Sequence, residues 1–177
     1  MTTTLPPLTT FIIMPRVGIK GQTYANTGSY SAPVWNRYKA ARDLTVAVSA
    51  NEVAVKNKGS IFVKYLSGLK DTPLDFEADW EPNEPVFDML QQCFWTQDPI
   101  DFLILDGGIK KVGAQGLRGG FIVTKFERSE PVEDVMSVSV SLRLSAEWPQ
   151  EPEWVKMSAG GVPVVVGAFG DDPDNDP

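Results

Sequence analysis

One stretch of the sequence decides the fold class: Leu74-Asp75-Phe76-Glu77-Ala78-Asp79-Trp80. Apolar and acidic residues alternate strictly along it. Because successive side chains of a β-strand point to opposite faces of a sheet, this period of two predicts a strand with one apolar and one acidic face. The acidic face presents the carboxylates of Asp75, Glu77 and Asp79.

The most regular alternation lies at residues 137–144, where Val and Leu alternate with polar residues. It predicts a strand whose wet face carries Ser137, Ser139 and Ser141. The 15 glycines and 14 prolines of the 177-residue chain indicate many turns and few long helices. We therefore expect a mainly β fold of the sandwich or barrel type, with long loops.

A hairpin is predicted upstream of the acidic strand. Alternation at 43–56 indicates two strands with a turn at 50–52. A basic, glycine-containing tip follows at 56–59, and a β-rich run resumes at 60–66. Together these segments predict a long hairpin with a basic tip.

Two more strands are predicted downstream. The nearly continuous apolar run at 100–105 indicates a buried strand that ends in a hairpin turn at 106–108. The glycine-rich segment 113–120 predicts a loop, which leads into a strand at 121–128.

The sequence predicts one convincing helix, at residues 83–95. Asn83 is the expected N-cap, and Glu84 and Pro85 suit a first helical turn. Apolar residues then recur at helical spacing, and Cys93 lies on this apolar stripe. We expect the helix to flank the sheet and Cys93 to be a buried packing residue.

The length suits one core with appended arms. We expect an extended N-terminal arm at 1–34, a β domain at 35–146 and an acidic, Pro/Gly-rich arm at 147–177. The C-terminal arm is open to two interpretations: a loosely docked, solvated tail, or a segment that pairs with a neighbouring subunit. No apolar run approaches the ~20 residues that span a bilayer. Residues 1–10 do not resemble a secretory signal. The single cysteine suits a reducing compartment.

Charge is divided into opposed blocks. Residues 37–70 contain seven bases and two acids, whereas residues 71–106 contain ten acids and no base. Complementary patches on one chain favour electrostatically guided self-association. The candidate contacts between subunits are Lys56, Lys58 and Lys64 from the basic block and Asp98 and Asp101 from the acidic block.

Catalysis and cofactor binding are disfavoured. The chain has no histidine, which removes the commonest general base and most zinc sites. The carboxylates at 75–79 are spaced permissively for glycoside hydrolysis, but no deep aromatic cleft accompanies them. The aspartates at 171–176 lack the glycine and distal Glu of a calcium loop. We expect no enzyme activity, metal or cofactor, and the acidic excess argues against specific nucleic-acid recognition.

The order of these features resembles the tail tube (major tail) proteins of long-tailed bacteriophages. The resemblance covers residues 35–146 and rests on the order and residue pattern of these segments rather than on any invariant motif. It is carried by Pro33-Val34-Trp35, Ala41-Arg42-Asp43-Leu44-Thr45-Val46, the 74–80 strand, the 83–95 helix, the 116–126 segment, Ser129-Glu130-Pro131 and the 135–144 strand.

This resemblance implies a β-sandwich with one flanking helix, six copies per ring, and stacked rings that form a tube through which genomic DNA passes. It further implies a tape measure protein, a tail terminator and distal tail proteins as partners, in a virion tail assembled in the host cytoplasm. We hypothesise that the lumen is lined either by the acidic face at 75–79 or by the serine face at 137–141. The alternative for the acidic face is an exterior, solvated position. The alternative functions are another β-sandwich virion module, such as a baseplate or decoration protein, and a carbohydrate-binding domain.

Overall fold

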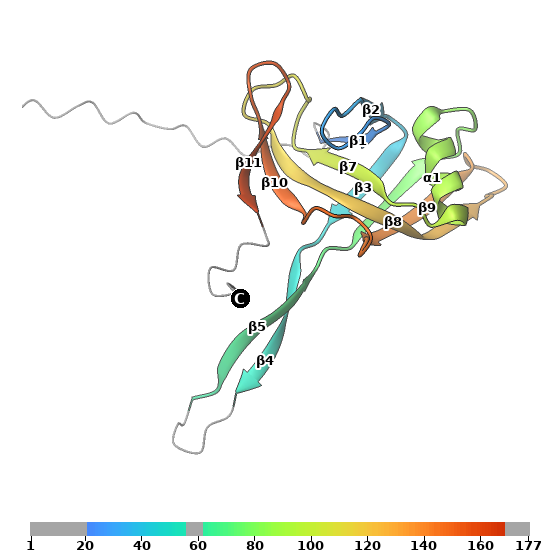
Figure 1. The fold of residues 1–177 in the computed structure, drawn as a ribbon. Coiled ribbons are helices and arrows are strands. Elements are labelled where there is room, and N and C mark those ends of the chain that lie inside the picture. Colours follow the sequence, from blue (N-terminus) through green and yellow to red (C-terminus); the bar gives the residue numbers. More distant parts are fainter. Residues whose placement is uncertain (1–20, 56–61, 169–177) are drawn as a thin grey trace, which may run out of the picture.

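The computed structural model describes residues 21–55 and 62–168 (Figure 1). These residues form eleven strands and one helix. The elements in chain order are β1 (Gln22–Asn26), β2 (Trp35–Tyr38), β3 (Ala41–Val46), β4 (Ser49–Val55), β5 (Lys64–Asp71), β6 (Leu74–Asp79), α1 (Pro85–Thr96), β7 (Ile100–Leu105), β8 (Gln115–Ser129), β9 (Ser137–Leu144), β10 (Glu153–Met157) and β11 (Pro163–Ala168).

The main sheet follows the strand order β2-β1-β7-β8-β9-β6-β3, and all of its pairings are antiparallel. β2 and β3 lie at opposite ends of this path, yet only Lys39 and Ala40 separate them in sequence. The sheet must therefore curve until its two ends approach each other, with α1 beside it (Figure 1). The predicted mainly β, sandwich-like fold with one flanking helix is confirmed.

The core occupies the inside of this curved sheet, and the predicted alternations supply it. The apolar residues of β6 and all but the last of those of β9 are buried, whereas Asp75 and Glu77 are exposed. Helix α1 adds its apolar stripe, in which Cys93 is buried as predicted. The main core residues from these three elements are Leu74, Phe76, Ala78, Val138, Val140, Leu142, Val86, Phe87 and Leu90.

The helix N-cap lies one residue later than predicted. Its N-cap is Glu84, whose carboxylate accepts a hydrogen bond from the Phe87 amide at 2.7 Å. Asn83 instead has a φ of 74°, so it forms a turn before the helix. Pro85 occupies the first helical turn because its missing N–H would have no intrahelical acceptor there.

Two predicted turns or loops were wrong, and the predicted hairpin connection after β7 is longer than expected. Residues 50–52 lie within β4, where the register with β5 shifts between Ala50 and Glu52. The connection after β7 spans 106–114 rather than a tight turn at 106–108. The glycine-rich segment belongs mostly to β8. Residue 116 must be a glycine, because a Cβ there would lie 1.6 Å from the Ile104 carbonyl oxygen. Here glycine permits close packing of two strands instead of a turn.

Both predicted arms contain strands of the main sheet. β1 lies between β2 and β7, although residues 22–26 were expected in an extended arm. β10 pairs with the N-terminal half of β8, and β11 pairs with β10. Val155 and Met157 of β10 are buried in a second apolar cluster with Leu103. The prediction of a loosely docked tail was therefore wrong for residues 153–157, while residues 171–177 lie outside the described part.

Candidate assembly surfaces

The two candidate lumen faces are one continuous surface. β6 and β9 are antiparallel neighbours, and directly opposed residues of such a pair lie on the same face of the sheet. The structure thus brings the two predicted sets together rather than offering a choice between them. In the register of the two strands, Asp75 opposes Ser141, Glu77 opposes Ser139 and Asp79 opposes Ser137.

Bases from the flanking strands make this surface less acidic than the sequence indicated. Arg42 of β3 forms an ion pair with Asp79 at 2.7 Å. Lys125 of β8 pairs with Glu127, which raises the pKa of Lys125 and lowers the pKa of Glu127 through a hydrogen bond. We call the face formed by Arg42, Asp75, Glu77, Asp79, Lys125, Glu127, Ser137, Ser139 and Ser141 the polar sheet face.

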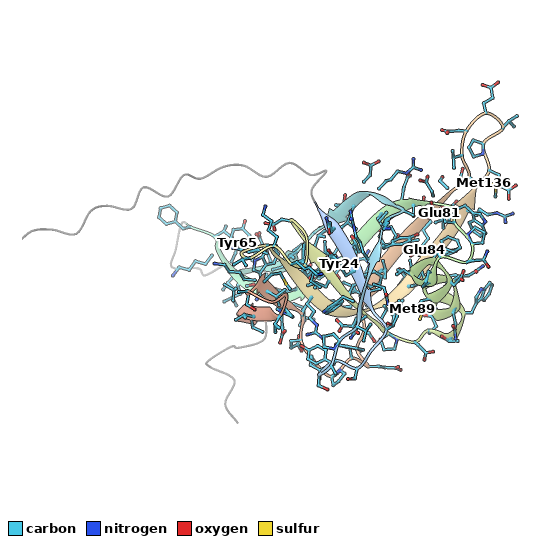
Figure 2. All side chains as sticks on the ribbon, turned by 90° about the horizontal axis from the view of Figure 1, so that it is seen from above. Tyr24, Tyr65, Glu81, Glu84, Met89 and Met136 are labelled. Atoms are coloured by element: carbon cyan, nitrogen blue, oxygen red, sulfur yellow. The ribbon has the colours of Figure 1, made fainter. Side chains whose placement is uncertain are left out.

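The β4–β5 hairpin stands clear of the core. Its strands form a separate two-stranded sheet (Figure 1), and Tyr65 lies at the opposite end of the molecule from Met89 of α1 (Figure 2). Almost every residue of the two strands is exposed, including the 85% exposed Leu69. An isolated two-stranded hairpin is marginally stable in water. The apolar residues exposed on it, here called the hairpin surface, are Val53, Val55, Tyr65, Leu66 and Leu69.

Sequence reasoning assigned only the lysines of this hairpin to subunit contacts. Lys64 is exposed at the start of β5, while Lys56 and Lys58 lie outside the described residues. The apolar residues were overlooked. A signal for them existed at 62–66, where the apolar residues follow no period of two and so cannot all face one core.

Asp101 cannot serve as a subunit contact, although Asp98 is exposed and remains a candidate. Asp101 is 3% exposed, and its Oδ2 lies 2.7 Å from Nη2 of Arg118. The same oxygen accepts a hydrogen bond from Nδ2 of Asn26 at 3.0 Å. The prediction for Asp101 was therefore wrong, because its charge is neutralised inside the subunit.

The buried Arg118–Asp101 pair holds the β1–β2 loop against the sheet. Nη2 of Arg118 donates to the Tyr30 carbonyl at 3.0 Å, and the guanidinium lies 3.8 Å from the centre of the Tyr30 ring. Asn26 accepts amide hydrogen bonds from Gly28 and Val34 with its Oδ1. These contacts fix the loop that leads into β2, one end of the curved sheet.

Unpaired strand edges form a further candidate surface. In the described part of the chain, β2 and β3 each pair on one side only, and β11 pairs only with β10. Val164, Val165 and Val166 of β11 are all about half exposed. Natural proteins rarely leave such apolar edges uncovered.

The described residues offer few groups suited to catalysis or metal binding. Burial raises the pKa of the Cys93 thiol, which opposes thiolate formation. Within residues 21–55 and 62–168 no group of three or more Cys, Asp or Glu side chains is placed to hold a metal ion. No helix in that part is long and apolar enough to cross a membrane.

The sequence matches no protein-family model and no curated protein. Solved structures do match. The tail of an empty gene transfer agent (GTA) particle, with C6 symmetry, has a TM-score of 0.62 at 12% identity and covers 76% of this chain and 97% of that one. The SPP1 tail tube has a TM-score of 0.59 at 14% identity, covering 73% and 76% of the two chains. A chain of the anti-feeding prophage (AFP) baseplate has a TM-score of 0.55 at 10% identity, covering 84% and 99%.

These likenesses extend over nearly the whole length of the GTA and AFP chains. At identities of 10–14% they establish the fold. This chain has the fold found in a phage tail tube, as the sequence resemblance implied.

Proposed function

We propose that this chain is a structural virion protein that assembles into stacked hexameric rings, which form the tube through which a phage ejects its DNA. One observation carries the proposal: a protein with the fold of a tail tube subunit exposes a long apolar hairpin that its own core does not use. Apolar side chains that are exposed together in this way mark a protein contact.

The positions of the exposed surfaces support head-to-tail assembly. A closed ring needs two different complementary patches on each subunit, and stacking needs a further pair along the axis. The hairpin surface, the one-sided edges of β2 and β3, and the β11 edge supply such patches. Six-fold symmetry is the arrangement named for the similar GTA tail.

For the lumen we propose the polar sheet face. It carries four carboxylates and two bases together with three serines, so its net charge is weakly negative. A hydrated wall of this kind repels DNA phosphates and offers no apolar surface, so DNA slides through it without specific binding.

The proposal extends to location and partners. As a tube subunit the chain would reside in the virion tail, after assembly in the host cytoplasm. A tape measure protein would set the tube length, and tail terminator and distal tail proteins would close its two ends. The role is structural and requires neither catalysis nor a cofactor.

Negative-stain electron microscopy of concentrated protein tests the proposal. We expect hollow rods or stacks of hexameric rings, and sedimentation should show species that grow with concentration. A chain that stays monomeric at every concentration would contradict the proposal.

A second candidate function is a baseplate subunit, favoured by the similarity to a chain of the AFP baseplate. A baseplate ring adds a small, defined number of layers, so it would form discrete discs rather than rods of variable length. A decoration protein would instead bind preformed capsids or tails, and a carbohydrate-binding domain would stay monomeric and bind sugars.

A further inference from the structure

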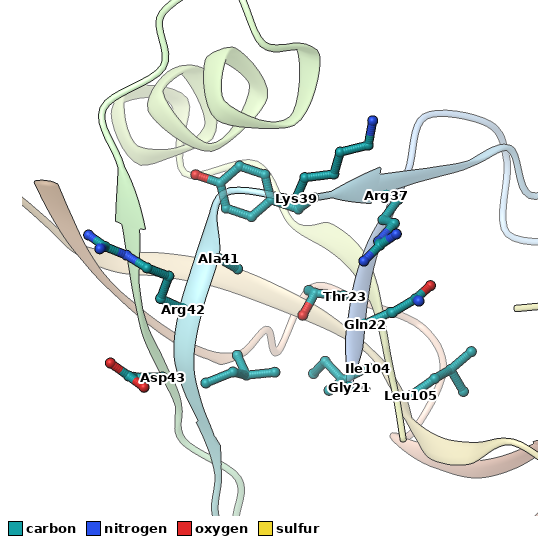
Figure 3. A pocket seen from close by; sticks show the side chains of 12 residues that line it. Gly21, Gln22, Thr23, Arg37, Lys39, Ala41, Arg42, Asp43, Ile104 and Leu105 are labelled. Atoms are coloured by element: carbon teal, nitrogen blue, oxygen red, sulfur yellow. The ribbon is translucent and has the colours of Figure 1, made fainter. Parts of the chain in front are cut away.

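A groove of about 710 Å³ opens where the two ends of the curved sheet diverge. β1 and β3 form its walls (Figure 3). Its floor contains Ile104 and Leu105 of β7, and Leu44 of β3 adds apolar surface. This volume lies within the range of pockets that hold ligands, about 300–1,000 Å³.

The groove is basic. Arg37, Lys39 and Arg42 line it, against one acid, Asp43. Arg42 is paired with Asp79, whereas Arg37 and Lys39 form no ion pair with any residue in the described part of the chain. Arg37 extends toward Gln22, and Lys39 extends outward from the rim (Figure 3).

The backbone of β3 is also available to a ligand. Within the described residues β3 pairs with β6 alone, so its other edge borders the groove without a strand partner. An unpaired edge binds extended peptide through main-chain hydrogen bonds, and charged side chains nearby select the peptide sequence.

One segment of this chain has the complementary charge. Residues 169–177 contain four aspartates and no base. The segment before β1 does not complement the basic groove, because residues 1–20 contain two bases and no acid.

The strand register shows that β11 runs away from the groove of its own subunit. β11 begins at Pro163, opposite Met157, at the end of β10 that lies nearest Gln115 and Leu105 and therefore nearest the groove. It ends at Ala168, opposite Glu153, at the level of Arg118. Ala168 therefore lies farther from the groove of its own subunit than Pro163 does.

Building on the proposed self-assembly, we propose that the acidic segment 169–177 of one copy binds in the basic groove of a second copy. The aspartates pair with Arg37 and Lys39, and the backbone of the segment lies along the free edge of β3. The interaction gives every subunit one donor segment and one acceptor groove, which is a heterologous contact.

Disulfide trapping between two variants tests this contact. Gln22→Cys places a thiol in the groove, and Asn175→Cys places one among the aspartates; neither change alters the charge. When the two full-length proteins, one carrying a size tag, are mixed under mild oxidant, we expect a disulfide-linked heterodimer. Val132→Cys, on the fully exposed loop after β8, replaces Gln22→Cys in the matched control.

Charge variants show whether the bases recognise the segment. Arg37→Glu with Lys39→Glu, added to the Gln22→Cys protein, should reduce the heterodimer to the level of the control. Lys110→Glu with Lys111→Glu changes the net charge by the same amount at residues that do not line the groove, so it should leave the yield of heterodimer unaltered. Raising the ionic strength to about 0.5 M should also reduce the yield, because exposed charges are then screened.

Three results would overturn the proposed docking: equal yields with Val132→Cys, an unchanged yield after reversal of Arg37 and Lys39, or only intramolecular disulfides in the Gln22→Cys/Asn175→Cys double variant. Microscopy of the same samples separates this proposal from the proposed function. Rods without the heterodimer refute the docking alone, whereas the absence of both contradicts self-assembly.

Discussion

At the scale of single residues, Arg118 and Asp101 form an ion pair that is buried inside the subunit. Both side chains are under 10% exposed, and Asn26 adds a hydrogen bond to the same carboxylate. A charge in such a place is tolerated only while its partner remains. The pair also fixes the loop before β2. Loss of the pair would therefore disturb the position of β2 at one end of the curved sheet.

We predict that Arg118→Met lowers the free energy of unfolding by about 3–5 kcal/mol, because it leaves the Asp101 carboxylate buried and unpaired. Urea denaturation of dilute, unassembled protein measures this. The Arg118→Met/Asp101→Leu double variant should recover much of the loss, since neither charge is then buried. A single variant as stable as the wild type would show that water reaches Asp101.

Tyr38 gives a prediction about pH. Its hydroxyl is buried and has no hydrogen-bond partner among residues 21–55 and 62–168. Burial raises the pKa of Tyr38, with smaller contributions from Glu84, Glu81 and Asp79. Tyrosine in the unfolded chain ionises near pH 10. The folded chain keeps Tyr38 protonated above that pH, so stability falls as pH rises past about 10, by up to ~1.4 kcal/mol per pH unit.

Tyr38→Phe should therefore reduce the loss of stability above pH 10 and should not destabilise the protein at pH 7, where the hydroxyl has no bond to lose. Tyr65→Phe is the matched control, because Tyr65 is exposed on the hairpin. Identical slopes for the wild type and Tyr38→Phe in denaturation at pH 7 to 11 would contradict the assignment.

At the scale of elements, we expect the β4–β5 hairpin to contribute to assembly but little to the stability of the monomer. Its apolar side chains contact no core, so replacing them costs the monomer little. In an assembled tube each buried leucine would contribute about 1.5–3 kcal/mol, repeated in every subunit.

We predict that Leu66→Ser with Leu69→Ser abolishes rod formation in electron microscopy, while the free energy of unfolding changes by less than about 0.5 kcal/mol. Val132→Ser, at a fully exposed position on the loop after β8, should leave both properties unchanged. Normal rods from the hairpin variant would exclude the hairpin surface from the assembly contacts.

At the scale of the whole molecule, opposed charge blocks in the sequence become a distribution that is partly neutralised within one subunit. Arg42, Arg118 and Arg143 pair with Asp79, Asp101 and Asp71 of the acidic block. Fewer acids therefore remain for neighbouring subunits than the sequence indicated, and the polar sheet face is weakly rather than strongly acidic.

A lumenal position of this face predicts an effect on DNA passage alone. Asp75→Lys with Glu77→Lys should still permit rod formation, because both side chains are exposed, but should slow DNA ejection from particles that carry the variant. Glu133→Lys with Asp134→Lys, on the loop after β8, changes the charge equally and should leave ejection normal. Unchanged ejection with Asp75→Lys/Glu77→Lys would place the face outside the lumen.

The sequence by itself determined the strands with strict alternation and the amphipathic helix. β6, β9 and α1 were predictable because burial of one face imposes a period of 2 or 3.6 on a single segment. The polar residues of β6 and β9 were predictable for the same reason.

Only the tertiary structure decided the features that depend on distant segments. Residue 116 must be a glycine because the Ile104 backbone approaches it closely. Asp101 can be buried because Arg118 pairs with it. β10 joins the sheet because β8 leaves an edge free beside it. Each of these outcomes depends on a contact between residues that are far apart in sequence, and local periodicity carries no record of such contacts.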